Sequence, residues 1–272
     1  MLNKTMNFDV AILNFSKIYD QESFYRSDKS SHFVDLCDIS GTNCMCDDEA
    51  AKEILSRISS PDRGALDSAH SMMPYGLHFI DNGNFHYMSS IYLSQVKEPF
   101  SLIVLDHHPD MQRPMFDILS CGGWIVDVLD HNEFVRDVHV IGADEKLIDE
   151  LDDEDRKKVH FYNIEDIFSD GPGGEIIVNL PDSSFPVYLS IDKDVIRKEE
   201  LTTNWDQGEA RPEQVLEFVR ALPAKRRLLG VDICGECAPD QEGCDLSRAI
   251  EENDRFNARV LEILEQEIGI NG

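Results

Sequence analysis

The stretch SLIVLDHHPD, residues 101–110, decides the fold class of this chain. Residues 102–105 form a short, unbroken apolar run, which is typical of a strand buried on both faces of a parallel sheet. Asp106, His108 and Asp110 then alternate directly after the run. Ligands of open parallel α/β sheets bind just beyond the carboxyl ends of the strands. This stretch therefore predicts an interior strand and a functional site where that strand ends.

Similar apolar runs recur along the chain and alternate with polar stretches that have helical spacing. This alternation predicts an α/β fold with a mostly parallel sheet covered on both faces. A loop is expected at residues 170–175, DGPGGE. Strands are expected at residues 8–15, 32–39, 76–80, 101–105, 138–141, 159–162, 186–191 and 228–231, and helices at 47–58, 212–222 and 247–268.

Composition excludes several classes of protein. The chain has 272 residues, with 25 Lys plus Arg against 53 Asp plus Glu, and a formal net charge of −28. Such a charge repels nucleic acid and anionic membrane surfaces, so neither is an expected partner. The sequence contains no apolar run of about 18 residues that would span a bilayer, and its first residues lack an apolar signal core. We therefore expect one globular domain over residues 1–272, located in the cytoplasm.

The seven cysteines permit two interpretations. Their odd number, without a signal peptide, argues against a disulfide framework. Cys44 and Cys46, together with Cys234 and Cys237, would in principle form a four-thiolate zinc site. The alternative is that they are reduced thiols, some packed as small hydrophobic side chains. We favour the second interpretation, because the usual paired Cys-x-x-Cys knuckles of zinc sites are missing.

Acidic residues follow three of the expected strands. They are the Asp106–Asp110 segment, the pair Asp192 and Asp194, and Asp232. If the backbone stays extended, residues i, i+2 and i+4 share a face. Four carboxylates and the His108 imidazole would then converge on one spot. Such a cluster would repel itself without cations, and two divalent metal ions would balance it.

This pattern resembles that of a known enzyme family. Asp-x-His-x-Asp at residues 106–110, followed by Ser-x-Asp-x-Asp at residues 190–194, resembles the arginase and agmatinase (ureohydrolase) family. The resemblance implies a three-layer α/β/α sandwich with a mostly parallel sheet of about eight strands. It also implies two Mn²⁺ ions per chain. The implied metal ligands are His86, Asp106, His108, Asp110, Asp192 and Asp194, with His86 in the segment NGNFH, residues 82–86.

The same resemblance implies a reaction. A hydroxide shared by the two metals would attack the planar carbon of a guanidino or amidino group and break its C–N bond. Asp110 and Glu236 are the candidate catalytic residues. Glu236 lies in DICGECAP, residues 232–239, which resembles a family segment whose Glu holds the substrate guanidinium, with one extra residue here. The expected substrate is a small cation, and the family resemblance implies a homo-oligomer.

Three further residues are candidates for substrate contact: Gln112, Cys121 and Trp205. Gln112 lies two residues past Asp110 and would offer an amide, while Trp205 would stack on a planar cation. Cys121 lies in SCGGW, residues 120–124, where arginases carry Ser-Gly-Asn-x-His with a proton-shuttling His. That His is missing here.

Two alternatives to a manganese ureohydrolase stay open. One is an amide deacetylase on the related fold, which would hold a single zinc ion with an Asp, His, Asp set. The other is a non-catalytic protein that kept the metal site and lost the shuttle His. A fold alone does not distinguish these functions.

Overall fold

The computed structural model describes residues 9–26, 31–59, 74–114 and 116–268. Their main feature is an eight-stranded sheet in which every neighbouring pair of strands is parallel. In spatial order its strands are β2 (Ser31–Asp35), β1 (Asp9–Asn14), β4 (Gly76–Phe79), β12 (Leu228–Cys234), β11 (Val187–Asp192), β5 (Phe100–Leu105), β7 (Val135–Ile141) and β8 (His160–Tyr162).

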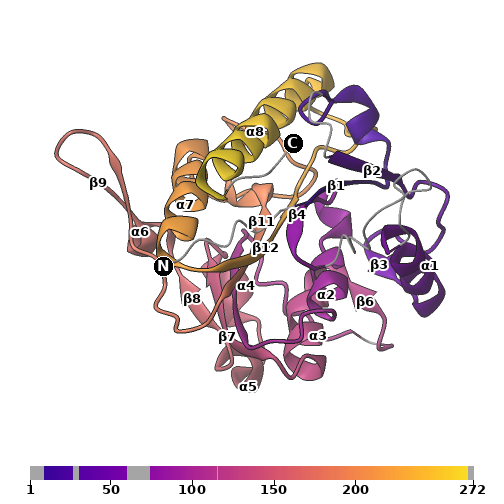
Figure 1. The fold of residues 1–272 in the computed structure, drawn as a ribbon, viewed down its shortest axis with the longest axis horizontal. Coiled ribbons are helices and arrows are strands. Elements are labelled where there is room, and N and C mark those ends of the chain that lie inside the picture. Colours follow the sequence, from indigo (N-terminus) through magenta and orange to yellow (C-terminus); the bar gives the residue numbers. More distant parts are fainter. Residues whose placement is uncertain (1–8, 27–30, 60–73, 115, 269–272) are drawn as a thin grey trace.

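Helices cover both faces of this sheet and give the α/β/α sandwich that the sequence predicted (Figure 1). Side chains alternate between two cores: Leu105 packs in one, and Val104 in the other. The first core is covered by α6 (Ile164–Ile167), α7 (Pro212–Lys225) and α8 (Leu246–Ile268), and the second by α1 (Asp48–Ile58), α2 (Met88–Leu93), α3 (Trp124–His131) and α4 (Glu145–Asp149).

The eight expected strands all occur, although their ends shift by a few residues. Strand β2 stops at Asp35, four residues before the expected end, and β12 continues to Cys234. Phe8, expected to begin the first strand, lies outside the described residues. The expected loop at residues 170–175 is the tip of an antiparallel hairpin of β9 (Phe168–Asp170) and β10 (Ile176–Val178), which projects from the body in Figure 1.

The remaining elements are short. Helix α5 (Asp153–Arg156) follows α4, and β3 (Met45–Cys46) pairs with β6 (Leu119–Ser120) in a second antiparallel pair. The 3₁₀ turns are η1 (Ile18–Gln21), η2 (Gly83–Phe85), η3 (Cys121–Gly123) and η4 (Lys193–Val195). Turn η4 directly follows β11, and η2 follows β4 after three residues, both near the centre of the sheet.

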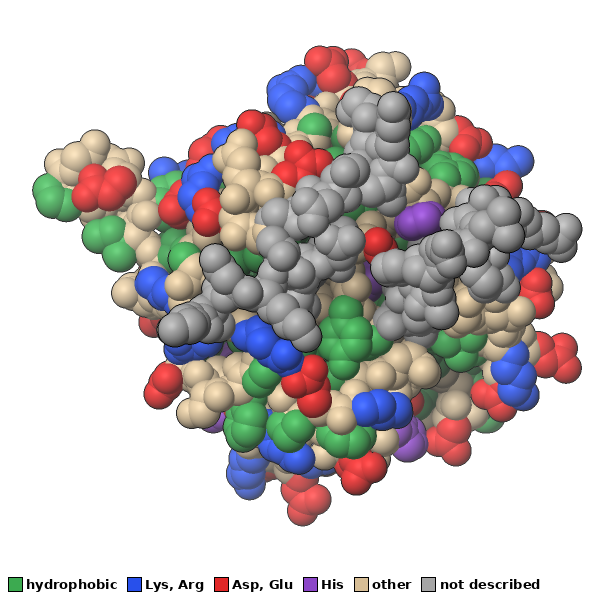
Figure 2. Space-filling model, viewed as in Figure 1, with side chains coloured by type: hydrophobic (Ala, Val, Ile, Leu, Met, Phe, Trp, Pro, Cys, Tyr) green, Lys and Arg blue, Asp and Glu red, His purple; other side chains and the backbone are tan. Residues whose placement is uncertain are grey.

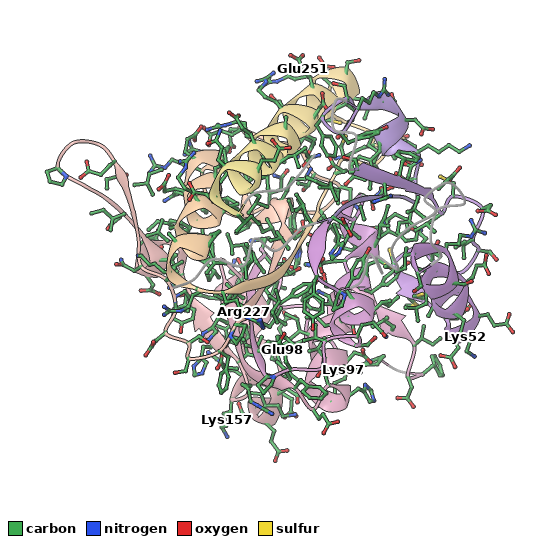
Figure 3. All side chains as sticks on the ribbon, viewed as in Figure 1. Lys52, Lys97, Glu98, Lys157, Arg227 and Glu251 are labelled. Carbon is green, nitrogen blue, oxygen red and sulfur yellow. The ribbon has the colours of Figure 1, made fainter. Side chains whose placement is uncertain are left out.

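Many of the charged side chains lie on the surface. Acidic and basic side chains are interspersed on the face shown in Figure 2. Glu98 and Arg227, labelled in Figure 3, form an ion pair next to the amino ends of β5 and β12, at the opposite edge of the sheet from residues 106–110. Within the described parts of the chain, no helix is long and apolar enough to cross a membrane.

The first testable prediction concerns the core. Leu189 is fully buried in the central strand β11. Leu189→Ala should lower the free energy of unfolding by about 2–5 kcal/mol, because it removes buried methyl groups and leaves a cavity. Denaturant unfolding measures this change. Ile177→Ala is the control, since Ile177 is 42% exposed in the projecting hairpin, and it should change stability by less than about 0.5 kcal/mol.

Candidate metal centre

Four neighbouring strands carry the candidate site. In the order β4-β12-β11-β5, they are the middle of the sheet, and their carboxyl ends lie at one edge. His86 follows η2 after β4, while Asp106 follows β5 and Asp192 ends β11. All six residues expected to bind metal occur in groups whose potential ligand atoms lie within 4.8 Å of one another. These groups are His86, Asp106 and Asp110; Asp106, His108 and Asp194; and His86, Asp192 and Cys234.

The convergence of these side chains has a different cause from the one expected. Strand β5 ends at Leu105, and the following residues form a turn in which the His108 backbone N–H donates to Asp106 Oδ1 at 2.6 Å. Asp110 has φ +47°, a left-handed conformation. The prediction of an extended i, i+2, i+4 segment is therefore wrong. The three side chains approach one another because the chain curls around the site.

The second acidic pair also departs from extended geometry. Asp192 is the N-cap of η4, and its Oδ1 accepts a hydrogen bond from the Asp194 backbone N–H at 2.9 Å. Asp194 in turn accepts from the His107 backbone N–H through Oδ1 and faces His108 Nδ1 through Oδ2, both at 2.9 Å. One carboxylate thus ties the end of β11 to the turn that follows β5.

Each candidate imidazole has an outer partner that fixes its orientation. His86 Nε2 lies 2.8 Å from Ser190 Oγ, and its Nδ1 lies 3.1 Å from Asp110 Oδ2 and 3.3 Å from Asp106 Oδ2. His108 Nε2 lies 3.1 Å from Asp206 Oδ1. In both rings Nδ1 faces the carboxylates of the cluster, and Nε2 faces the outer partner, which is Ser190 for His86 and Asp206 for His108. Metal-binding histidines usually have this arrangement, because the outer hydrogen bond selects the ring tautomer.

The electrostatics of the cluster indicate missing positive charge. Burial, followed by the neighbouring charges of Asp194 and Asp106, raises the pKa of Asp192 to about 7. Burial and Asp106 raise the pKa of Asp194 to about 6. Asp106 Oδ2 is buried and has no hydrogen-bond partner among the described residues. Cations placed between these oxygens would relieve both the repulsion and the unpaired oxygen, so the donor set fits divalent metal ions.

A cavity of about 750 Å³ opens onto this cluster. Its lining includes five of the six expected ligands, and it includes Gln112, Cys121 and Trp205, the three candidate substrate-contact residues. Trp205 is 42% exposed, and its Nε1 donates to Asn84 Oδ1 at 3.0 Å. Burial, followed by the nearby Asp110 charge, raises the pKa of Cys121 to about 12, so its thiol is a poor nucleophile near neutral pH.

Trp124 is the last residue of SCGGW, the segment in which the sequence lacks the expected shuttle His. The indole is fully buried, and its Nε1 donates to Asp110 Oδ2 at 2.7 Å. An indole N–H donates only, so Trp124 can orient Asp110 but cannot relay a proton. His131, the next histidine along the chain, contacts Asp127 on the exposed side of α3 instead.

Glu236 is directed away from the cavity. Its carboxylate is fully buried, forms an ion pair with Lys193 and accepts a hydrogen bond from Asn257 Nδ2 at 2.8 Å. It is not among the residues that line the cavity. Gly235, with φ +93°, directly precedes Glu236, and the Glu236 carboxylate lies against Asn257 of α8. In this structure Glu236 neutralises Lys193, the residue between the two acidic ligand candidates.

The expectation for Asp232 is corrected. Asp232 lies inside β12 rather than after it, and its Oδ1 contacts His78 and Tyr188 at 2.7 and 2.8 Å, so it is not part of the acidic cluster. The cysteines agree with the favoured interpretation as reduced thiols, because all seven are free. No potential metal group in the described chain contains two of the cysteines Cys44, Cys46, Cys234 and Cys237.

Sequence reasoning missed several residues of this site, namely Ser190, Asp206, Trp124 and Cys234. Ser190 had a usable signal, because it lies two residues before Asp192 on the same face of the strand. Trp124 and Asp206 lie in segments that were noted for other residues. The position of Cys234 depends on the register between β11 and β12, which a single sequence does not show.

The chain is similar to known proteins over most of its length. Residues 11–249 match the model of the Arginase family. An uncharacterized protein of Thermotoga maritima is 30% identical over 230 residues, which are 85% of this chain and 80% of that protein. The formimidoylglutamase of Bacillus subtilis has a TM-score of 0.62 at 15% identity, over 94% of this chain and 88% of that one. A T. brucei arginase-like triple mutant bound with Mn²⁺ has a TM-score of 0.55 at 16% identity, over 96% and 91% of the two chains.

This chain is a member of the Arginase family, because the family match spans most of its length. The solved structures share its fold and differ widely in sequence. The family's known members are hydrolases that act on C–N bonds.

The raised pKa values predict how the metal-free protein responds to pH. A carboxyl group whose pKa is higher when folded gives stability that is present below its unfolded value, about 4, and is lost as pH rises through the folded value. For Asp192 that window ends at about pH 7. Metal-free protein should therefore unfold more easily at pH 8 than at pH 5, and Asp192→Asn should reduce this difference.

Thermal unfolding in the presence of a chelator measures the effect. Asp182→Asn is the control, since Asp182 is fully exposed and outside the cluster. If Asp192→Asn keeps the same pH dependence as the unmodified protein, buried carboxylate repulsion is not what destabilises the metal-free site.

A further prediction distinguishes a structural role of Glu236 from direct contact with substrate. Glu236→Gln should lower the free energy of unfolding by about 3–5 kcal/mol, because it leaves the buried Lys193 charge without its partner. The double variant with Glu236→Gln and Lys193→Met should recover most of the lost free energy of unfolding. Urea unfolding of both variants measures it. Normal stability of Glu236→Gln with a large loss of turnover would instead indicate direct contact with substrate.

Proposed function

We propose that this chain is a binuclear manganese hydrolase that cleaves a guanidino or amidino C–N bond. One observation carries the proposal. Two groups of potential ligands adjoin each other and share Asp106: His86, Asp106 and Asp110 form one, and Asp106, His108 and Asp194 form the other. A carboxylate common to two groups is what a two-metal site requires, whereas a single-zinc deacetylase site needs only one group.

The donor types support manganese as the metal. Carboxylates and imidazoles suit Mn²⁺, and the triple mutant of the T. brucei arginase-like protein named above is bound with that ion. When bound, a metal pair lowers the pKa of a shared water to near neutrality and supplies a hydroxide nucleophile. We assign the metals to the six residues expected from sequence: His86, Asp106, His108, Asp110, Asp192 and Asp194.

Asp110 is the candidate that orients the attacking water. It lines the cavity, and Trp124 Nε1 donates a hydrogen bond to its Oδ2 at 2.7 Å, which fixes the orientation of the carboxylate. A carboxylate in this position can accept a proton from the water and return it to the departing amine. Because Trp124 cannot relay protons, we assign that transfer to Asp110 and to water in the open cavity.

The cavity wall supports a cationic substrate. Beyond the metal ligands it carries Glu150 and Asp152, with Arg113 as the one cationic side chain in the described lining. Arg113 is itself paired with Asp155 through two hydrogen bonds of 2.6 Å. An excess of acidic groups remains, and the exposed Trp205 ring offers a face on which a guanidinium would stack. The Gln112 amide would hydrogen-bond a polar group at the other end of the substrate.

The test is turnover by the metal-loaded protein. Protein purified with Mn²⁺ should release urea or ammonia from at least one member of a panel of guanidino, amidino and formimidoyl compounds. The Asp192→Ala variant should bind one metal ion tightly instead of two. Its turnover rate should fall by more than about 100-fold, because loss of a residue that only hydrogen-bonds a metal ligand costs up to about 100-fold. Asp182→Ala, at an exposed position, should match the unmodified protein.

The opposite outcomes are equally specific. Protein that holds two manganese ions and releases nothing from the whole panel would be a non-catalytic metal-binding protein. One zinc ion per chain with release of acetate from an acetylated amine would make it a deacetylase. Unchanged metal stoichiometry in Asp192→Ala would remove Asp192 from the ligand set.

A further inference from the structure

Cys234 occupies a position fixed by the sheet. It is the last residue of β12 and lies in register with Asp192, the last residue of β11. The next residue, Gly235, has φ +93°, and a Cβ there would lie 2.4 Å from Asp192 Oδ1. The backbone therefore turns tightly against the acidic pair. Sheet register and this turn together hold the Cys234 side chain at the edge of the metal site.

The Cys234 thiol is buried in the core and also lies beside two of the expected metal ligands. Cys234 is 1% exposed, and its Sγ donates to Asp192 Oδ2 at 3.1 Å. His86 Nδ1 lies 3.5 Å from the same carboxylate oxygen. The potential ligand atoms of His86, Asp192 and Cys234 lie within 4.8 Å of one another. A metal bound to His86 and Asp192 would therefore have sulfur within reach.

We propose that Cys234 is a sulfur ligand of the metal held by His86, and that the two metal positions therefore differ in chemistry. The inference rests on the two-metal function proposed above and deepens it. The position at His86 has a nitrogen, oxygen and sulfur donor set. The position at His108 has only nitrogen and oxygen donors in the described chain, from Asp106, His108 and Asp194.

The two metal positions should differ in metal selectivity. Thiolate ligands favour Zn²⁺ and Co²⁺ over Mn²⁺, whereas carboxylates and imidazoles suit Mn²⁺. When Cys234 binds, its S–H bond breaks, a sulfur–metal bond forms, and the proton passes to solvent. The position at His86 should thus prefer the softer ion, and the position at His108 should accept manganese. A mixed pair is the expected state when both metals are supplied.

Cobalt substitution tests the proposal without an activity assay. Metal-free full-length protein titrated with Co²⁺ should develop a near-ultraviolet absorption band from thiolate-to-cobalt charge transfer. Cys234→Ser should still bind Co²⁺ but lack this band, and its affinity for Zn²⁺ should fall at least about tenfold relative to Mn²⁺. Cys237→Ser is the matched control. Cys237 is also fully buried three residues away and belongs to no potential metal group in the described chain, so its band should be unchanged.

The outcomes separate this inference from the function on which it rests. Stoichiometric Co²⁺ binding without the band in the unmodified protein would show that Cys234 is not a ligand, even if guanidino or amidino turnover is present. A band that survives in Cys234→Ser would assign the sulfur to another cysteine. Failure to bind any metal would overturn both proposals. Because the unmodified protein alone decides the first outcome, the test does not depend on the folding of a variant.

Discussion

Mutual repulsion among buried carboxylates is the constraint on which the rest of this structure depends. The four carboxylates of the cluster are each less than 8% exposed, and its described basic side chains are two imidazoles, those of His86 and His108. The four carboxylates are those of Asp106, Asp110, Asp192 and Asp194. In a metal-free chain this arrangement must take up protons, which is why burial and neighbouring charge raise the pKa of Asp192 and Asp194. Divalent cations remove the need for those protons. Much of the surrounding structure holds the carboxylates in place despite their repulsion.

The sheet order explains how four segments far apart in sequence reach one spot. Strands β4, β12, β11 and β5 are spatial neighbours, and β4 and β11 lead into the short turns η2 and η4. The turns are held by hydrogen bonds to the ligand candidates themselves, as in the contacts of Asp192 and Asp194 with backbone N–H groups. The buried ion pair of Lys193 with Glu236 then connects the turn after β11 to the end of β12, and Asn257 joins it to α8.

Much of this was visible in the sequence, because apolar runs and their polar ends carry strong signals. The eight strands, the parallel sheet and the six residues that now lie together at its edge were all predicted. The local geometry was not. Whether Asp110 adopts φ +47°, or whether Asp232 lies inside a strand, depends on where a strand stops, and an isolated run of apolar residues does not fix that point.

The side-chain directions after β12 were equally hidden. The chain turns at Gly235, which has φ +93°; Glu236 after it pairs with Lys193, and Cys234 before it lies beside Asp192. Beside the acids and imidazoles this chain therefore places a buried thiol, Cys234, and a buried indole, Trp124, while Glu236 does not line the cavity. Such differences are expected to alter metal choice and substrate before they alter the fold.

Anomalous X-ray diffraction from crystals grown with Mn²⁺ tests the central claim most directly. Two manganese peaks are expected about 3.5–4 Å apart, one beside His86 and the other beside His108, with the Asp106 carboxylate in contact with both. A single peak, or peaks remote from Asp106, would contradict the assignment of this cluster as a two-metal centre.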